Sequence, residues 1–140
     1  MAYPFIDTDV IIRLLTGDDP VKQQRAASLF EQIERGDLTV TAPVTVIADA
    51  VFVLSSYRLY NLPRHEIASA LAHLVRIPNF RVKNRRAVLA ALDIYGSNPF
   101  KLDFGDAFIL ASMMQSGSRD VYSFDAHFDR MPGINRLEPD

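Results

Sequence analysis

The sequence contains no cysteine and only three lysines, Lys22, Lys83 and Lys101. Without cysteine, disulfides, zinc–thiolate sites and thiol nucleophiles are excluded. No apolar run approaches the roughly 20 residues that span a bilayer, and no basic stretch followed by an apolar segment opens the chain, so nothing suggests export. We therefore expect a cytoplasmic protein with no membrane association.

The composition is that of an ordinary globular protein. The chain has 140 residues, of which 49% are hydrophobic and 23% are charged, and this length suits one domain with a genuine core. A net charge of −2 does not indicate a nucleic-acid binder. It does not exclude one either, because such binding depends on local patches, and residues 81–86 form one candidate.

Short apolar or β-branched runs alternate with amphipathic helical patterns along the chain. The runs predict strands at residues 3–6, 38–42, 80–82, 121–124 and 134–137. Helical spacing follows each of the first three of these strands. The predicted helices include two that start near Pro20 and Pro43 and one that spans 103–116. This alternation predicts a single domain, residues 1–140, of the α/β class with a mostly parallel sheet.

Two predicted strands end at an aspartate. Asp7 follows the first strand, with Thr8 next to it, and Asp125 follows the strand near the carboxyl end, two residues after Ser123. Carboxylates at the carboxyl ends of parallel strands lie where such sheets keep their ligand crevice. The alternatives are an ordinary N-cap at Asp7 or Thr8 and a simple turn aspartate at Asp125.

Asp49 interrupts an otherwise apolar run from Val46 to Leu54. A carboxylate buried in such a run must be paired, neutralised or bound to a metal, because an isolated buried charge is very costly. Alternatively, Asp49 lies on an exposed stripe with Thr45 and Ser56, or an arginine pairs with it.

Asp103 and Asp106 are three residues apart at the start of a predicted helix and so share a face. Capping explains Asp103, whereas Asp106 lies one turn inside the helix and is the better site candidate. Carboxylates that converge in one cleft repel one another unless a cation is present, and hard oxygen ligands favour Mg²⁺ or Mn²⁺. The three histidines show no zinc-ligand spacing, and we interpret them as surface or core residues.

Four segments of the chain resemble the PIN-domain family, specifically the VapC-type toxins of toxin–antitoxin pairs. They are FIDTDVIIRLL, VIADAVFVL, LDFGDAFILASMMQSG and VYSFDAHFDRMPGI, and they occur in the order typical of the family. The resemblance places the acidic quartet of the family on Asp7, Asp49, Asp106 and Asp125, with Thr8 and Ser123 at its supporting hydroxyl positions. This chain departs from the usual pattern where Asp49 replaces glutamate and Asp9 replaces asparagine.

The resemblance implies a three-layer α/β/α fold around a central, mostly parallel sheet of four to five strands. It also implies Mg²⁺- or Mn²⁺-dependent cleavage of RNA, a homodimer and a cognate antitoxin. The helices 20–35 and 43–59 would form a groove for that antitoxin. Basic residues at the rim would follow the RNA backbone, and the candidates are Arg13, Arg58, Lys101 and Arg130.

Two other interpretations remain open at this point. Asp7-Thr8-Asp9 after a strand also fits the opening of haloacid-dehalogenase-type phosphatases, with Asp7 as the nucleophile. None of the three lysines lies at an obvious catalytic position for that chemistry. The remaining alternative is a binding module that keeps the PIN-like fold and has lost its activity.

Overall fold

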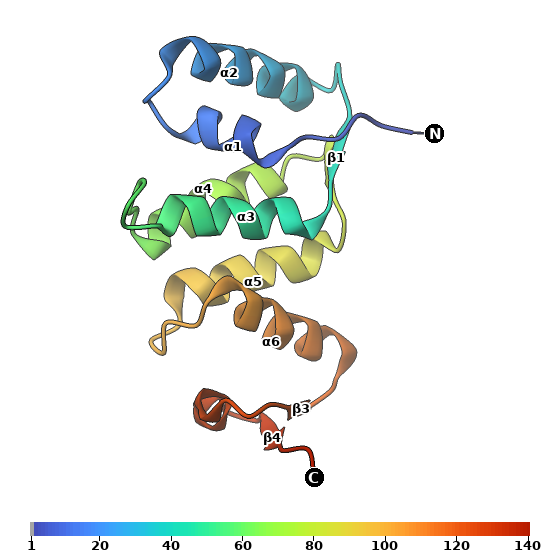
Figure 1. Ribbon diagram of the computed structural model, residues 1–140. Coiled ribbons are helices and arrows are strands. Elements are labelled where there is room, and N and C mark those ends of the chain that lie inside the picture. Colours follow the sequence, from blue (N-terminus) through green and yellow to red (C-terminus); the bar gives the residue numbers. More distant parts are fainter. Residues whose placement is uncertain (1) are drawn as a thin grey trace.

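The computed structural model describes residues 2–140, and the described chain is mainly helical (Figure 1). Short strands lie between the helices. The elements, in chain order, are α1 (Thr8–Leu15), α2 (Pro20–Arg35), β1 (Val40–Ala42), α3 (Val44–Ser55), α4 (Arg64–Val75), β2 (Phe80–Val82), α5 (Arg85–Ser97), α6 (Phe104–Ser116), β3 (Asp120–Tyr122), the 3₁₀ helix η1 (Ala126–Arg130) and β4 (Asn135–Leu137).

Local signals in the sequence define the ends of the helices. In α2, Asp19 caps the first turn by accepting a hydrogen bond from the Lys22 backbone N–H, and Gly36 ends the helix in the left-handed conformation with a φ of 85°. In α6, Asp103 caps the first turn and Gly117, with a φ of 77°, ends the helix. The predicted start at Pro20, the stop at Gly36 and the helix near 103–116 are confirmed.

The strands are parallel, as predicted, but they form two separate sheets. β1 pairs with β2, and β3 pairs with β4. The first predicted strand, residues 3–6, joins β1 only through a bridge between Phe5 and Thr41. The α/β class is therefore confirmed. The expected single central sheet is interrupted, because the segment 3–6 and β3 belong to separate sheets.

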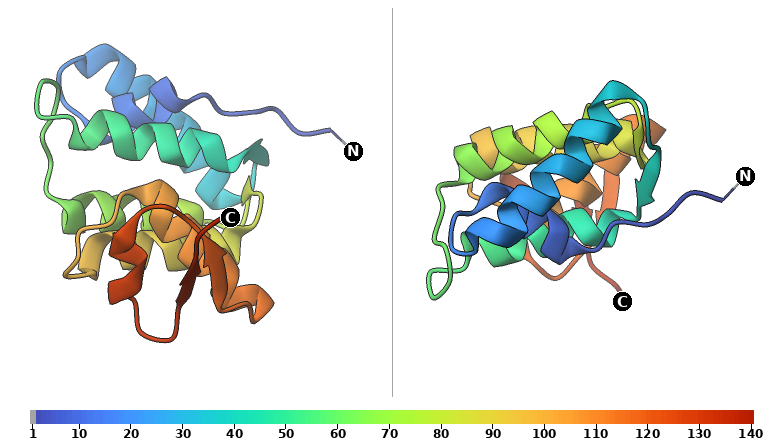
Figure 2. Two further views of the ribbon diagram at one scale, coloured as in Figure 1. Left: turned by 60° about the horizontal axis from the view of Figure 1, so that its bottom comes forward. Right: turned by 90° about the horizontal axis from the view of Figure 1, so that it is seen from above.

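Packing of the C-terminal unit explains this division. Phe128 and Met131 are buried against Leu110 and Met113 of α6, in a small cluster separate from the main core. β3 and β4 consequently lie beyond α6, whereas the N-terminal segment lies beside β1 at the other end of the helix stack (Figure 1; Figure 2, left). The predicted buried strand 3–6 is buried only at Ile6, and Phe5 is 72% exposed.

The main core lies between the helices and the β1–β2 sheet. Its largest fully buried side chain is Phe80 of β2, whose ring meets that of Phe30 edge-on at a centroid distance of 5.7 Å. Helices α4 and α5 approach closely at Gly96, where an added Cβ would lie 2.6 Å from the Ala68 Cβ. Among residues 2–140, no helix is both long and apolar enough to cross a membrane.

Candidate metal centre

Asp7 and Asp49 line one cavity between α1 and α3. Asp7 precedes α1, and its Oδ1 accepts a hydrogen bond from the Thr8 backbone N–H at 2.7 Å, so it is an N-cap in its geometry. Its side chain is nevertheless exposed to a cavity of about 530 Å³, which Thr8 and Asp49 also line. The capping interpretation of Asp7 and a role in a site are therefore compatible.

Asp49 is exposed, in agreement with the exposed-stripe alternative. It follows Thr45 and precedes Phe52 on one face of α3, and both of these side chains are also exposed. Among the described residues, no arginine or lysine forms an ion pair with Asp49. Its charge therefore faces the cavity that it shares with Asp7 and is not buried in the core.

Asp103 and Asp106 interact as the D-x-x-D spacing predicts. The Asp103 carboxylate accepts a hydrogen bond from the Asp106 backbone N–H at 2.8 Å and so caps α6. Asp106 is the third residue of α6 and so lies in its first turn, with a half-buried side chain. The cap orients the turn that carries Asp106, which leaves the Asp106 carboxylate free for other partners.

Asp125 and His127 come from the loop that follows β3. The Ser123 hydroxyl oxygen accepts a hydrogen bond from the Asp125 backbone N–H at 2.9 Å, which holds this turn. The His127 Nδ1 lies 2.6 Å from Asp125 Oδ1, and its Nε2 lies 2.9 Å from Asp106 Oδ2. The imidazole ring thus lies between the two carboxylates.

These three side chains form a candidate metal centre. One ligand atom from each of Asp106, Asp125 and His127 lies within 4.8 Å of the other two. The His127 Nε2 is buried and makes no hydrogen bond of suitable angle, despite its short distance to Asp106. Two carboxylates and one buried imidazole nitrogen fit a divalent cation, and the nitrogen favours Mn²⁺ over Mg²⁺.

Burial and neighbouring charges both act on Asp106 in this cluster. Burial raises the pKa of Asp106 above its usual value, and the negative charges of Asp103 and Asp125 raise it further, while His127 opposes the shift. A bound cation would remove this repulsion.

The structure brings the four predicted acids together as two pairs. Asp7 and Asp49 share a cavity, and Asp106 and Asp125 share the cluster with His127. In the part of the chain that is described, no group of three close metal-ligating side chains includes Asp7 or Asp49. Phe52 lines both the Asp7–Asp49 cavity and the neighbouring cavity that contains Asp103, so the two pairs border the same exposed side chain.

Of the four rim cations predicted from sequence, only Arg13 lines a cavity with these acids. Arg58 hydrogen-bonds to the Tyr57 hydroxyl at 3.1 Å. The guanidinium of Arg130 lies over the Phe100 ring at 6.0 Å from its centroid, and Lys101 is exposed.

Sequence reasoning missed two residues. His127 was interpreted as a surface or core residue, although its position two residues after Asp125 was a weak signal of proximity. Arg64 had no signal in the sequence, yet its guanidinium donates hydrogen bonds to the carbonyls of Tyr95, Lys101 and Leu102. It thereby holds the segment that leads to the Asp103 cap.

Comparison with known proteins gives one family. The family described as PIN domain matches residues 5–134. No curated protein matches the chain. The matched range includes all four predicted acids, Asp103 and His127.

Proposed function

The chain belongs to the PIN-domain family, and on this basis we propose that it is an endoribonuclease that requires Mg²⁺ or Mn²⁺. Proteins of this family are, as a rule, metal-dependent nucleases. The proposal goes further in naming RNA as the substrate and hydrolysis of its phosphodiester bonds as the reaction. It treats residues 1–140 as one catalytic domain.

The convergence of Asp106, Asp125 and His127 is the observation that carries this proposal. Three ligand atoms from two distant segments lie within 4.8 Å of one another, and one of them is a buried nitrogen without an aligned partner. A cation held by these three side chains would give that nitrogen a ligand bond in addition to its contact with the Asp106 carboxylate.

Such a cation would supply Lewis-acid polarisation of the scissile phosphate and a lowered pKa for its bound water. The protein residues supply orientation. Asp103 fixes the first turn of α6, and Ser123 fixes the turn that carries Asp125. We assign Asp106 and Asp125 as the principal ligands and Asp103 and Ser123 as supporting residues.

We propose that Asp7, Thr8 and Asp49 complete the site from the other side. The segment 3–6 pairs with β1 on one edge only, and β3 pairs with β4 on one edge only. If β3 joined the free edge of segment 3–6 in the same direction, Asp7 and Asp125 would lie at one end of a continuous parallel sheet. The shorter side chain of Asp49, compared with glutamate, suits contact through a water molecule.

The biological role that fits this activity is that of a toxin in a toxin–antitoxin pair, acting in the cytoplasm. This part of the proposal is supported by the resemblance of the four sequence segments to VapC-type proteins. Helix α1 packs against both α2 and α3, so the expected groove between 20–35 and 43–59 is filled by α1. We instead propose an antitoxin surface around three exposed apolar side chains, Phe52, Tyr57 and Leu59, which are at least 62% exposed, and a homodimer as the toxin state.

The experiment is RNA cleavage by the purified chain with and without Mn²⁺ or Mg²⁺. Cleavage should require the cation and should be lost in Asp106→Asn and Asp125→Asn. Asp93→Asn is the matched control, because Asp93 is an exposed aspartate on α5 that has no ion-pair partner among residues 2–140. Mapping of the RNA ends, after expression with and without a co-expressed antitoxin, would identify the target.

Thermal stability in the presence of Mn²⁺ separates an active site from an inactive binding module. Mn²⁺ at about 100 times its dissociation constant should stabilise the wild type by about 2.7 kcal/mol. The Asp106→Asn variant should gain much less. Cleavage of RNA at equal rates by Asp106→Asn and Asp93→Asn would contradict the proposal.

A further inference from the structure

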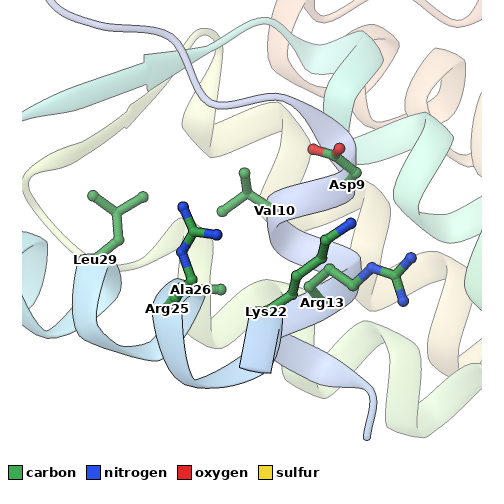
Figure 3. Close-up of a pocket in the computed structure, with 7 residues that line it drawn as sticks. All are labelled: Asp9, Val10, Arg13, Lys22, Arg25, Ala26 and Leu29. Atoms are coloured by element: carbon green, nitrogen blue, oxygen red, sulfur yellow. The ribbon is translucent and has the colours of Figure 1, made fainter. Parts of the chain in front are cut away.

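A basic cleft lies between α1 and α2, next to the Asp7–Asp49 cavity. It has a volume of about 330 Å³, and its cations are Arg13 of α1 and Lys22 and Arg25 of α2. Figure 3 shows the side chains of Lys22 and Arg25 extending from α2 toward α1. One acid, Asp9, shares the cleft with these three cations.

The charges of this cleft are incompletely neutralised within the protein. Arg13 pairs with Asp18 at 3.2 Å, whereas neither Lys22 nor Arg25 forms an ion pair with any carboxylate of residues 2–140. Like charges that line one small cleft repel one another, and an anion placed between them removes this cost.

Continuity with the acid cavity indicates what kind of anion this cleft takes. Asp9 and Arg13 line both the basic cleft and the cavity that contains Asp7 and Asp49. A ligand that extends from one cavity into the other would meet cations on one side and carboxylates on the other. A polymer with a repeated negative charge and flexible links fits this path when a cation neutralises the carboxylates, as the proposed function requires.

The lining of the cleft is also apolar in part. Val10 of α1 and Ala26 and Leu29 of α2 line it beside the cations. A single-stranded nucleotide presents a charged phosphate on one side and an apolar base face on the other, whereas an acidic peptide has no such planar apolar group at each charge. The combination favours single-stranded RNA over an acidic protein segment.

We propose that the cleft between α1 and α2 is a phosphate subsite for single-stranded RNA, in which Lys22 and Arg25 contact the backbone of nucleotides adjacent to the cleavage site. This inference rests on the proposed ribonuclease function and adds the path of the substrate. Arg13, at the boundary of the two cavities, would contact the phosphate nearest the acids. Asp9 faces Lys22 and would limit how tightly the phosphate is held.

The test is the affinity of a fluorescein-labelled single-stranded RNA oligonucleotide, measured by fluorescence anisotropy at several salt concentrations. All proteins carry Asp106→Asn so that the RNA stays intact. The test variant is Lys22→Gln with Arg25→Gln. The matched control is Arg76→Gln with Arg119→Gln, which also removes two exposed positive charges, from surfaces outside the cleft and outside the basic segment 81–86.

We expect the test variant to bind RNA at least about tenfold more weakly, with a salt slope that is smaller by about 1.4 because two phosphate contacts are lost. The control changes the net charge equally but leaves the cleft intact, so it should bind within about twofold of its parent. Equal losses in both variants, or no loss in the test variant, would overturn the subsite. If the parent does not bind RNA and the protein without Asp106→Asn does not cleave it, the proposed function fails as well. If the protein cleaves RNA but the test variant binds it as tightly as the parent does, only the subsite fails.

Discussion

The Nε2 atom of His127 lies 2.9 Å from the Oδ2 atom of Asp106, yet it makes no hydrogen bond of suitable angle. The same ring contacts Asp125 through its Nδ1 at 2.6 Å. This arrangement, with an imidazole between two acids from separate elements, is the feature on which the proposed metal centre depends.

His127→Ala should weaken Mn²⁺ binding by about 10- to 100-fold. The loss should be larger for Mn²⁺ than for Mg²⁺, because an imidazole nitrogen suits Mn²⁺ better than the harder Mg²⁺. Isothermal titration of both ions into both proteins would measure this. His73→Ala is the control, because His73 is exposed and lies 3.7 Å from Glu34 on another surface. An unchanged ratio of Mn²⁺ to Mg²⁺ affinity would show that His127 is not a ligand.

Asp106 predicts a pH dependence of stability in the metal-free protein. Burial, followed by the charges of Asp103 and Asp125, raises its pKa above 3.8, so folding favours its neutral form. Its contribution to stability is therefore complete below the unfolded pKa and is lost as the pH rises through the higher folded pKa. Asp106→Asn removes this loss, so the variant should become more stable relative to the wild type as the pH rises from about 3 through the raised folded pKa.

Thermal unfolding across this pH range would measure the effect, first with a chelator and then with Mn²⁺. The difference in stability between Asp106→Asn and the wild type should change sign with excess Mn²⁺, because only the wild type gains the free energy of binding. The stability of Asp93→Asn should change with pH in the same way as that of the wild type under both conditions. The same pH dependence in Asp106→Asn would contradict the raised pKa.

Much of the helical framework could be predicted from the sequence, because its signals are local. Pro20 and Gly36 mark the ends of α2, and Asp103 marks the start of α6 through a bond to a backbone N–H only three residues away. The exposure of Asp49 was less certain, since an apolar run on both sides conceals which face of α3 points outward.

Contacts between distant segments could not be read in the same way. Nothing local tells which strand takes the free edge of segment 3–6, because pairing depends on where the C-terminal unit packs. The position of His127 beside Asp106 depends on Phe128 and Met131 packing onto α6. The assignment of all four acids to one site therefore stays a prediction, although two of the four do lie together.

We expect Arg64 to be a positioning residue for the proposed metal centre. Its guanidinium donates to the carbonyls of Tyr95 at 3.2 Å and Lys101 at 2.9 Å, and it lies 4.4 Å from the centroid of the Tyr95 ring. A lysine cannot reproduce this planar fork. Arg64→Lys should therefore lower the free energy of unfolding by about 1–3 kcal/mol.

The same variant should weaken Mn²⁺ binding although Arg64 touches none of the acids, because the segment that leads to Asp103 loses its anchor. Denaturant unfolding and Mn²⁺ titration would measure the two effects. Arg76→Lys, a change of the same type at an exposed position that follows α4, should alter neither. Equal stability and equal Mn²⁺ affinity of the two variants would show that Arg64 does not position the site.

Pairing of segment 3–6 with β3 can be tested directly, because the chain has no cysteine of its own. Phe5 and Tyr122 are 72% and 70% exposed, which leaves large aromatic side chains in water on two unpaired strand edges. Phe5→Cys combined with Tyr122→Cys forms a disulfide only if the two Cα atoms come within about 7 Å. We expect this bond to form under mild oxidation when Mg²⁺ is present and to form poorly with a chelator, because repulsion between Asp7 and Asp125 opposes the pairing until a cation screens it.

A non-reducing gel distinguishes closure within one chain, which gives a cross-linked monomer, from exchange of β3 between two copies, which gives a dimer. Phe5→Cys with Met114→Cys is the control, because Met114 is 68% exposed on α6 and lies outside both strands. Cross-linking that does not exceed this control, with or without Mg²⁺, would mean that the edges never meet. Asp7 and Asp49 would then act apart from Asp106 and Asp125, and the metal centre would consist of Asp106, Asp125 and His127 alone.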